Sequence, residues 1–312
     1  MTKQIKLANP RGFCAGVDRA IDIVNKALDI YGAPVYVKHE VVHNKVVVAD
    51  LRDRGAIFVE EIDEIPDDSL VIFSAHGVSS AVEEETKSRN LNFFDATCPL
   101  VTKVHMEVRK HAKASKDVIL VGHEGHPEVE GTMGRHINSE NSSIYLVQNE
   151  LDAKNIEINN PTKLALVTQT TLSVDETKSI IDILKHRFPE IDIPKKDDIC
   201  YATQNRQDAV KQLALESDFM IVVGSKNSSN SNRLSELAEK CGCRSILIDE
   251  FTDIDLDDLN NYSKISITAG ASAPESKVME IAKSLEQHTD AEIIEHGEDN
   301  EDIYFKLPPG LR

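Results

Sequence analysis

The chain has no apolar run that approaches the roughly 20 residues needed to cross a bilayer. Its first residues also have no apolar region of the signal-peptide type. Hydrophobic residues are 40% of the 312 residues and charged residues 28%, which is ordinary for a globular protein. We therefore expect a cytoplasmic protein without a membrane partner, long enough for about two domains.

A basic stripe, the usual sign of a nucleic-acid-binding surface, is also missing. The 35 basic residues are outnumbered by 53 acidic ones, which gives a formal net charge of −18. We therefore expect no nucleic-acid partner, and we attribute the acidic excess to solubility.

The five cysteines contain no C-x-x-C pair and no pattern of a small disulfide-stapled scaffold. Cys241 continues an apolar helical stripe and Cys243 lies just past Gly242, so both are expected to be buried core residues. Cys14, Cys98 and Cys200 lie in polar surroundings at strand or helix boundaries. Their spacing alone leaves both burial and metal ligation open.

Cys98 lies directly before Pro99, a residue type favoured at the first helical position. The spacing of Val101, Val104 and Val108 predicts the helix that follows. Near its N-cap, exposed N–H groups and the helix dipole stabilise a thiolate.

An aspartate precedes two of the three cysteines at the same spacing: Asp95 stands three residues before Cys98, and Asp197 three before Cys200. Together with the Cys14 segment, this weak repeat suggests three α/β units of about 100 residues. We take the meeting of the three sulfurs as the hypothesis to test. Three thiolates can hold an iron–sulfur cluster and leave one iron open to a substrate oxygen.

Apolar strands repeatedly run into short polar loops and then into amphipathic helices, which is the α/β signature with parallel sheets. No Pro/Gly/Ser-rich linker interrupts the series. We predict three similar α/β units, 1–98, 99–196 and 197–284, followed by a tail, 285–312, that packs back on the body. Ile303–Leu307 is predicted as a final strand.

Ligands of parallel α/β sheets bind where the strands end and the helices begin. Helix capping would explain any one of the polar loops predicted there. Five such loops in one chain favour a shared anionic ligand, a phosphate or diphosphate. The loop side chains are His76, His126, Glu128, Thr170, Ser228, Ser229, Asn230 and Ser272.

Glu128 follows His126-Pro127 in what we predict to be a loop rather than a regular helix. A carboxyl beside histidine and threonine can act as a general acid or in a proton relay. Glu124 and Glu130 are its competitors by proximity.

His39-Glu40-Val41-Val42-His43 matches the zinc-hydrolase pattern H-E-x-x-H, which works only on a helix. Here it follows a predicted strand and contains two valines, so a strand or loop is expected. We favour His43 as a hydrogen-bond donor to an anion. A zinc hydrolase using His39 and His43 remains an alternative function, as does a non-catalytic redox sensor using the three cysteines.

Eight segments of this chain resemble the 4-hydroxy-3-methylbut-2-enyl diphosphate reductase family, the last enzymes of the non-mevalonate isoprenoid pathway. The resemblance covers essentially the whole chain. Its markers are Asn9–Val17, Glu40–Asn44, Phe73–Val78, Asp95–Pro99, Gly125–Val129, Thr168–Ser173, Ser225–Asn230 and Thr268–Ser272.

The resemblance implies a trefoil of the three α/β units around one [4Fe–4S] cluster per chain, held by Cys14, Cys98 and Cys200. The iron without a cysteine would bind the substrate's allylic hydroxyl. Two electrons and two protons would then remove water and leave isopentenyl and dimethylallyl diphosphates. Glu128 would be the proton source, helped by His126 and Thr170. The diphosphate would lie among His43, His76, His126, Ser228, Ser229, Asn230 and Ser272.

An electron donor such as a flavodoxin or ferredoxin is the implied protein partner. These carriers are usually acidic, so a chain at −18 needs a local basic patch to receive one. Arg11 and Lys103, near the cysteine loops, are the sequence candidates.

Overall fold

The computed structural model describes residues 4–136, 141–194, 198–298 and 301–312. The chain forms two compact bodies. We call Met1–Asp18, His43–Ala49 and Tyr201–Tyr304 the terminal body, and Arg19–Val42, Asp50–Cys200 and Phe305–Arg312 the central body. Asp197 and its place before Cys200 lie outside the described residues.

The terminal body contains one parallel sheet of order β10-β9-β11-β1-β12. Its strands are β1 (Gln4–Ala8), β9 (Phe219–Val223), β10 (Arg244–Ile248), β11 (Lys264–Ala269) and β12 (Glu292–His296). Its helices are α8 (Tyr201–Ala214), α9 (Ser229–Lys240), α10 (Leu256–Leu259) and α11 (Glu275–Thr289), with the 3-10 turn η2 (Phe251–Asp253). Two further helices, α1 (Ala15–Tyr31) and α2 (Lys45–Asp53), start in this body and end in the central one.

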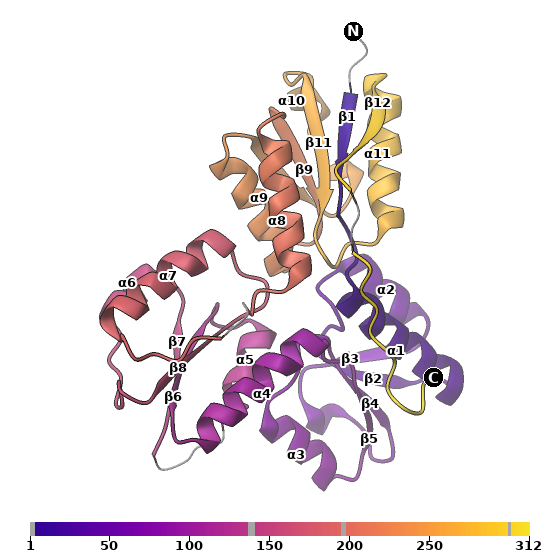
Figure 1. The fold of residues 1–312 in the computed structure, drawn as a ribbon. Coiled ribbons are helices and arrows are strands. Elements are labelled where there is room, and N and C mark those ends of the chain that lie inside the picture. Colours follow the sequence, from indigo (N-terminus) through magenta and orange to yellow (C-terminus); the bar gives the residue numbers. More distant parts are fainter. Residues whose placement is uncertain (1–3, 137–140, 195–197, 299–300) are drawn as a thin grey trace. The chain divides into compact units, whose positions relative to one another are not determined.

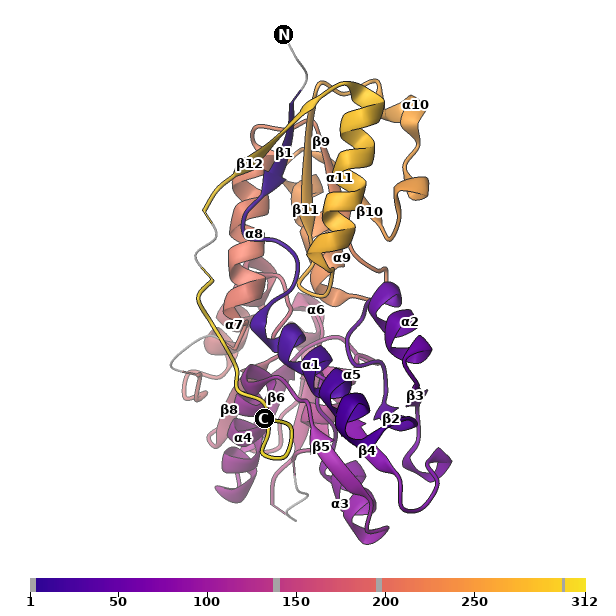
Figure 2. The same cartoon turned by 90° about the vertical axis from the view of Figure 1, so that its right-hand side faces the viewer.

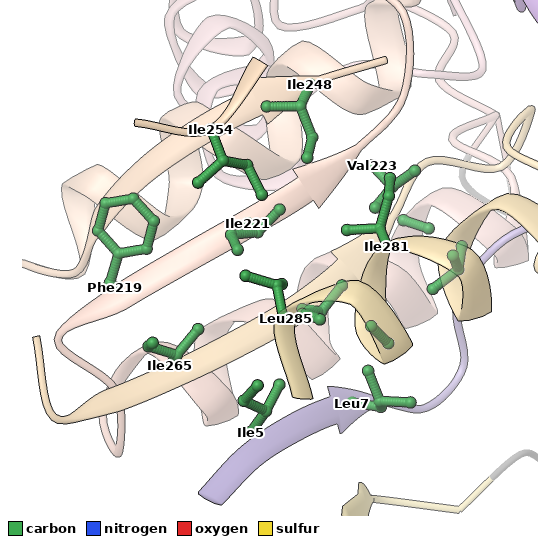
Figure 3. Packing of buried hydrophobic residues seen from close by; sticks show 14 of the residues in the cluster. Ile5, Leu7, Phe219, Ile221, Val223, Ile248, Ile254, Ile265, Ile281 and Leu285 are labelled. Atoms are coloured by element: carbon green, nitrogen blue, oxygen red, sulfur yellow. The ribbon is translucent and has the colours of Figure 1, made fainter. Parts of the chain in front are cut away.

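Alternate residues of these strands face two separate cores. Ile5, Leu7 and Ile221 pack with α11 on one face (Figure 3). Met220 and Val222 pack with α8 and α9 on the other. Figures 1 and 2 show α11 and the pair α8 and α9 on opposite sides of the sheet. Burial on both faces explains why the strands read as continuous apolar runs.

The central body contains two parallel sheets. One has the order β3-β2-β4-β5, with β2 (Val35–Lys38), β3 (Ala56–Val59), β4 (Leu70–Phe73) and β5 (Asn92–Asp95). The other has the order β7-β6-β8, with β6 (Asp117–Val121), β7 (Ile144–Val147) and β8 (Leu164–Thr168). The helices are α3 (Ser80–Ser88), α4 (Pro99–Lys113), α5 (Pro127–Met133), α6 (Glu150–Asn155) and α7 (Val174–Arg187), with the 3-10 turn η1 (Ile62–Glu64).

The β7-β6-β8 sheet is sandwiched between helices. Ile119 and Leu166 pack with α6 and α7 on one face. Leu120 and Val167 pack with Val104 of α4 and with α5 on the other face. The helix that follows Cys98 is thus held against this sheet by its apolar stripe.

One strand order recurs in all three sheets. A first strand lies between the second and the third, and a fourth strand pairs with the third. This fourth place is taken by β5 beside β4, by β1 beside β11, and by an isolated parallel bridge of Asp192 to Ala165 in β8. Each fourth strand or bridge segment leads to one of the three cysteines. The predicted α/β class with three parallel sheets is confirmed.

Two expectations differ from the observed pairing. β1 was assigned by sequence to the unit 1–98, but it hydrogen-bonds to β11 and β12 near the other end of the chain. The predicted strand at Ile303–Leu307 is wrong, because these residues form no strand. The carbonyls of Lys306 and Leu307 instead accept from the arginines Arg19 and Arg312. In Figure 2 this C-terminal segment runs beside α1.

The predicted unit boundaries at 98, 196 and 284 stay a prediction. Residue 284 itself lies inside α11. Across the described residues, no helix is both long enough and apolar enough to span a membrane.

Leu7→Ala tests the place of β1 in the terminal sheet. Leu7 is fully buried between β11 and β12 neighbours, so truncation should lower the free energy of unfolding by about 2–5 kcal/mol. Urea unfolding followed by circular dichroism measures it. Leu215→Ala, at a side chain 79% exposed, is the control and should change little. A Leu7→Ala effect as small as the control's would contradict the pairing.

Candidate functional site

Each of the three candidate ligand cysteines stands directly before a helix. Cys14 precedes α1, Cys98 is the N-cap residue of α4, and Cys200 precedes α8. Pro99 takes the first helical position, as predicted. The free N–H groups and positive dipole end of a helix favour a thiolate at this place.

The backbone N–H of each cysteine is fixed in the same way. Cys14 donates to Ala271 O at 3.3 Å, Cys98 to Ala75 O at 3.0 Å and Cys200 to Thr170 O at 3.0 Å. Each acceptor lies two residues beyond the end of a third strand, β11, β4 or β8. The repeated strand order therefore brings each cysteine to the carboxyl end of a parallel sheet.

These cysteines have the chemistry of metal ligands. All three are only partly buried, whereas Cys243 is fully buried and Cys241 packs on the same core, as expected. Burial raises the pKa of the Cys14 thiol, and the Arg206 guanidinium opposes this. A bound cation would stabilise such a thiolate, so the donor set fits a metal cluster.

The meeting of the three sulfurs stays a prediction. Cys98 and Cys200 belong to the central body and Cys14 to the terminal body. The described residues contain no group of three or more His, Cys, Asp or Glu side chains that could by itself hold a metal ion.

Glu128 lies in the first turn of α5, so its predicted loop setting is wrong. Pro127 at the first helical position starts this short helix and turns Glu128 inward. The carboxyl is almost fully buried. Its Oε1 accepts from the Thr170 N–H at 2.6 Å, and its Oε2 is 2.9 Å from the Thr170 hydroxyl.

Desolvation dominates the electrostatics of Glu128. Burial raises the pKa of Glu128 to about 7; the two Thr170 bonds lower it, and the charge of Asp198 raises it. The group is therefore half-protonated near neutral pH, which suits a general acid. Glu130, a sequence competitor, is exposed.

The histidines of the central body stand near this acid. His126 caps α5, and its Nδ1 accepts from the Glu128 N–H at 3.1 Å. An accepting Nδ1 places the ring proton of neutral His126 on Nε2, which makes Nε2 a donor. The His76 ring lies edge-on to His126, with centroids 5.8 Å apart. Cys200, Thr170, Glu128 and His126 thus form one connected set.

The terminal body gathers the other polar candidates. Ser228 caps α9, and its Oγ accepts from both the N–H and the hydroxyl of Ser231. The Ser272 hydroxyl donates to His43 O at 2.9 Å and lies 3.4 Å from Ser228 Oγ. Since two donors occupy the lone pairs of Ser228, its own O–H is left to donate.

Ser229 and Asn230 form the first turn of α9. Asn230 Oδ1 accepts from the Ala271 N–H at 2.9 Å. Glu128 makes the equivalent bond to Thr170, at the same place in its own repeat. Asn230 is therefore the structural counterpart of Glu128. An amide in this place has no acidic proton, so of these two repeats only the one with Glu128 has a carboxyl group here.

Two buried charged residues that the sequence reasoning missed hold the cysteine loops. Arg206 of α8 is fully buried, donates to Gly12 O and Phe13 O, and pairs with Glu301. Asp198 accepts from the Thr168 N–H and pairs with Lys103. The signal that the sequence offers for Asp198 is its place two residues before Cys200. Arg206 reads as an ordinary helix residue.

The H-E-x-x-H segment is not helical. His39 and His43 lie in the connection after β2, and His39 has a left-handed backbone with φ of 63°. The histidines therefore do not share a helix face, as the zinc pattern requires. His39 Nδ1 instead lies 2.8 Å from Glu60 Oε2. The geometry gives the zinc-hydrolase alternative no support.

The family model described as LytB protein matches residues 5–286 of this chain. Curated relatives named 4-hydroxy-3-methylbut-2-enyl diphosphate reductase are 60% identical over 99% of this chain. They include those of Marinobacter nauticus, with 98% of the relative covered, and Saccharophagus degradans, with 99% covered.

Two solved structures match the fold. The E-1-hydroxy-2-methyl-but-2-enyl-4-diphosphate reductase of Plasmodium falciparum has a TM-score of 0.92 at 37% identity and covers 99% of this chain and 96% of its own. An (E)-4-hydroxy-3-methyl-but-2-enyl diphosphate reductase, described as the terminal enzyme of the non-mevalonate pathway, has a TM-score of 0.64 at 29% identity. That match covers 91% of this chain and 99% of the other.

Thr170→Val tests the electrostatics of Glu128. The hydrogen bond from the Thr170 hydroxyl stabilises the ionised carboxylate of Glu128. Removing the hydroxyl should therefore raise the pKa of Glu128 further, by about one unit. Infrared difference spectra against Glu128→Gln, recorded over pH, follow the carboxyl band. Thr171→Val is the control, since the Thr171 hydroxyl bonds to the Gln169 amide. An unchanged or lower pKa in Thr170→Val would contradict the assignment.

Proposed function

Because the chain belongs to the LytB protein family, we propose that it reduces (E)-4-hydroxy-3-methylbut-2-enyl diphosphate to isopentenyl and dimethylallyl diphosphates. It is an oxidoreductase of the non-mevalonate pathway. The observation that supports this chemistry most directly is the equivalent anchoring of Cys14, Cys98 and Cys200 at three helix starts.

We assign one [4Fe–4S] cluster per chain to these three cysteines. Three protein thiolates leave one of four irons without a cysteine ligand. When bound, such a cluster supplies electrons and a Lewis-acid iron site for the substrate's allylic hydroxyl. The buried Arg206 and the Asp198–Lys103 pair keep two of the cysteine loops in place.

We assign the substrate's diphosphate to hydrogen-bond donors at helix starts. Ser228 caps α9 and Ser229 begins it, and the O–H of Ser228 is one proposed donor. His126 offers its Nε2 proton, since its Nδ1 is occupied by the Glu128 N–H. His43, His76, Asn230 and Ser272 complete the proposed set. Helix N-termini and neutral donors bind phosphate oxygens well.

Glu128 is the proposed proton source. The reaction breaks the allylic C–O bond, takes up two electrons and two protons, forms one C–H bond and releases water. Near neutral pH a protonated Glu128 can pass its proton to Thr170 Oγ1, 2.9 Å away, while the Thr170 hydroxyl passes its own proton to the substrate. Desolvation disfavours the ionised carboxylate, so part of the Glu128 population still carries this proton near pH 7.

The two electrons require a reduced carrier, and we propose a flavodoxin or a ferredoxin. We also propose a cytoplasmic enzyme, because five cysteines without a disulfide pattern suit a reducing compartment. A redox sensor without catalysis is the weaker reading, because it gives no role to the buried, half-protonated Glu128.

Glu128→Gln should separate binding from proton transfer. The amide keeps the shape and can still accept from the Thr170 N–H, but it has no acidic proton. We expect turnover to fall by about 100-fold or more, with unchanged iron content and unchanged affinity for the diphosphate substrate. Anaerobic assay with a viologen reductant and calorimetric titration measure these quantities. Glu130→Gln, on the exposed side of α5, is the matched control. Near-normal turnover of Glu128→Gln would remove this residue from the proton path.

Cys98→Ser tests the ligand assignment. A serine hydroxyl keeps the helix start but is a poor iron ligand, so anaerobically purified protein should lose most of its iron and acid-labile sulfide. Cys241→Ser, which changes a core cysteine, should retain both. Full iron and sulfide content in Cys98→Ser would show that another residue holds that iron.

A further inference from the structure

α4 is the most basic helix of the described structure. It carries Lys103, Arg109, Lys110 and Lys113 against one acid, Glu107. Every other helix of the described residues has a formal charge, counted from Lys, Arg, Asp and Glu, that is negative, zero or +1. This concentration stands out in a chain whose net charge is −18.

Three of the four basic side chains share one exposed face of α4, whereas Arg109 lies off this face and pairs with Glu83. Lys103, Met106, Lys110 and Lys113 recur at spacings of three or four residues, and we call this set the α4 face. The opposite side of the helix is buried, with Val101, Val104 and Val108 in contact with the body.

The α4 face combines accessible charge with accessible apolar area. Met106 is 64% exposed. Within the described residues, neither Lys110 nor Lys113 takes part in an ion pair, whereas Lys103 pairs with Asp198 and Glu107. A flexible, polarisable methionine among lysines is a common composition for a surface that binds partners transiently.

The other sequence candidate for a basic patch is not available. Arg11 is ion-paired to Glu275 and Glu295, and only 7% of its side chain is exposed. Its charge is therefore balanced within the terminal body. The structure therefore gives no support to the expectation that Arg11 contributes to an electron-donor patch.

The α4 face lies close to a proposed cluster ligand. α4 begins directly after Cys98, and at 1.5 Å per residue Met106 lies about 12 Å along the helix axis from that cysteine. The face is continuous with the helix whose first turn holds the ligand. Because electron transfer falls steeply with distance, the donor's redox group would approach Cys98 at the Lys103 end of the face, about 8 Å along the axis from that cysteine.

We propose that the α4 face is the docking site of an acidic one-electron carrier protein of the flavodoxin or ferredoxin class. Two reduced carriers dock in turn, and each is oxidised by one electron. Together they supply the two electrons that the substrate takes up with two protons when water leaves. Lysines at the rim steer the acidic partner, and Met106 provides the apolar contact. This inference rests on the proposed reductase function.

Lys110→Glu/Lys113→Glu is the test variant, measured in the cluster-containing protein. A flavodoxin titrated calorimetrically should bind wild-type protein with an affinity that falls as salt rises, because exposed charges are screened. The double variant should bind about tenfold more weakly and lose most of this salt dependence. Lys178→Glu/Lys185→Glu on α7 makes the same change in net charge and should bind like wild type.

Steady-state rates give a second readout. With reduced flavodoxin, the test variant should need about tenfold more donor for half-maximal rate; with a small viologen reductant its rate should equal that of wild type. Wild type that binds flavodoxin but reduces no substrate with viologen would refute the proposed function and leave the docking result standing.

Equal flavodoxin affinity in the test variant and wild type would overturn the docking site. An equal loss in the α7 control would overturn it too, because net charge alone would then govern binding. Met106→Ala and Lys110→Ala/Lys113→Ala, which avoid new acids on the helix, must also weaken binding for the proposal to stand.

Discussion

One hydrogen bond, repeated three times, determines the position of every proposed cluster ligand. The N–H of each cysteine donates to a carbonyl two residues past the end of a third strand. That carbonyl has left the sheet ladder, so it is available to a chain segment arriving from the fourth strand. The donor then leads directly into a helix. The strand order therefore fixes both the position of each cysteine and the start of the helix that follows it.

A repeated frame allows different chemistry at equivalent places. In one repeat a buried carboxyl of Glu128 accepts from the Thr170 N–H, and in another an amide of Asn230 accepts from the Ala271 N–H. The third repeat uses the backbone, since the Ala75 N–H donates to Val41 O. Each of these N–H groups belongs to the residue whose carbonyl anchors a cysteine. The peptide of Thr170 thus joins the proposed acid to the anchor of Cys200.

The burial of Glu128 is costly for an ionised carboxyl, and the protein keeps that cost small by leaving the group half-protonated near pH 7. Below that pH the neutral acid is the dominant form, and above it the proton is lost. The desolvation that raises the pKa of Glu128 therefore keeps part of the carboxyl groups protonated near pH 7, and this is the proton that the proposed reaction consumes.

Local pattern was sufficient for the strands and for the Cys98 helix start, because apolar runs and a proline at the first helical position are local signals. It was not sufficient for β1, since pairing with β11 is a contact between the two ends of the chain. Ile303–Leu307 has residues typical of a strand, but two of its carbonyls, those of Lys306 and Leu307, accept hydrogen bonds from arginine side chains instead of from a neighbouring strand. Local pattern predicts a loop at Glu128, because α5 has seven residues and is too short to show a helical period. The role of Arg206 depends on burial, which a polar helix sequence does not reveal.

The most direct test of the iron–sulfur diphosphate reductase assignment is Mössbauer spectroscopy of anaerobic, iron-57-labelled protein with and without the allylic diphosphate. The account predicts four irons per chain, of which one changes its spectrum when substrate is added while three stay unchanged. Four irons that all remain unaffected by substrate, or protein without iron and sulfide, would contradict it.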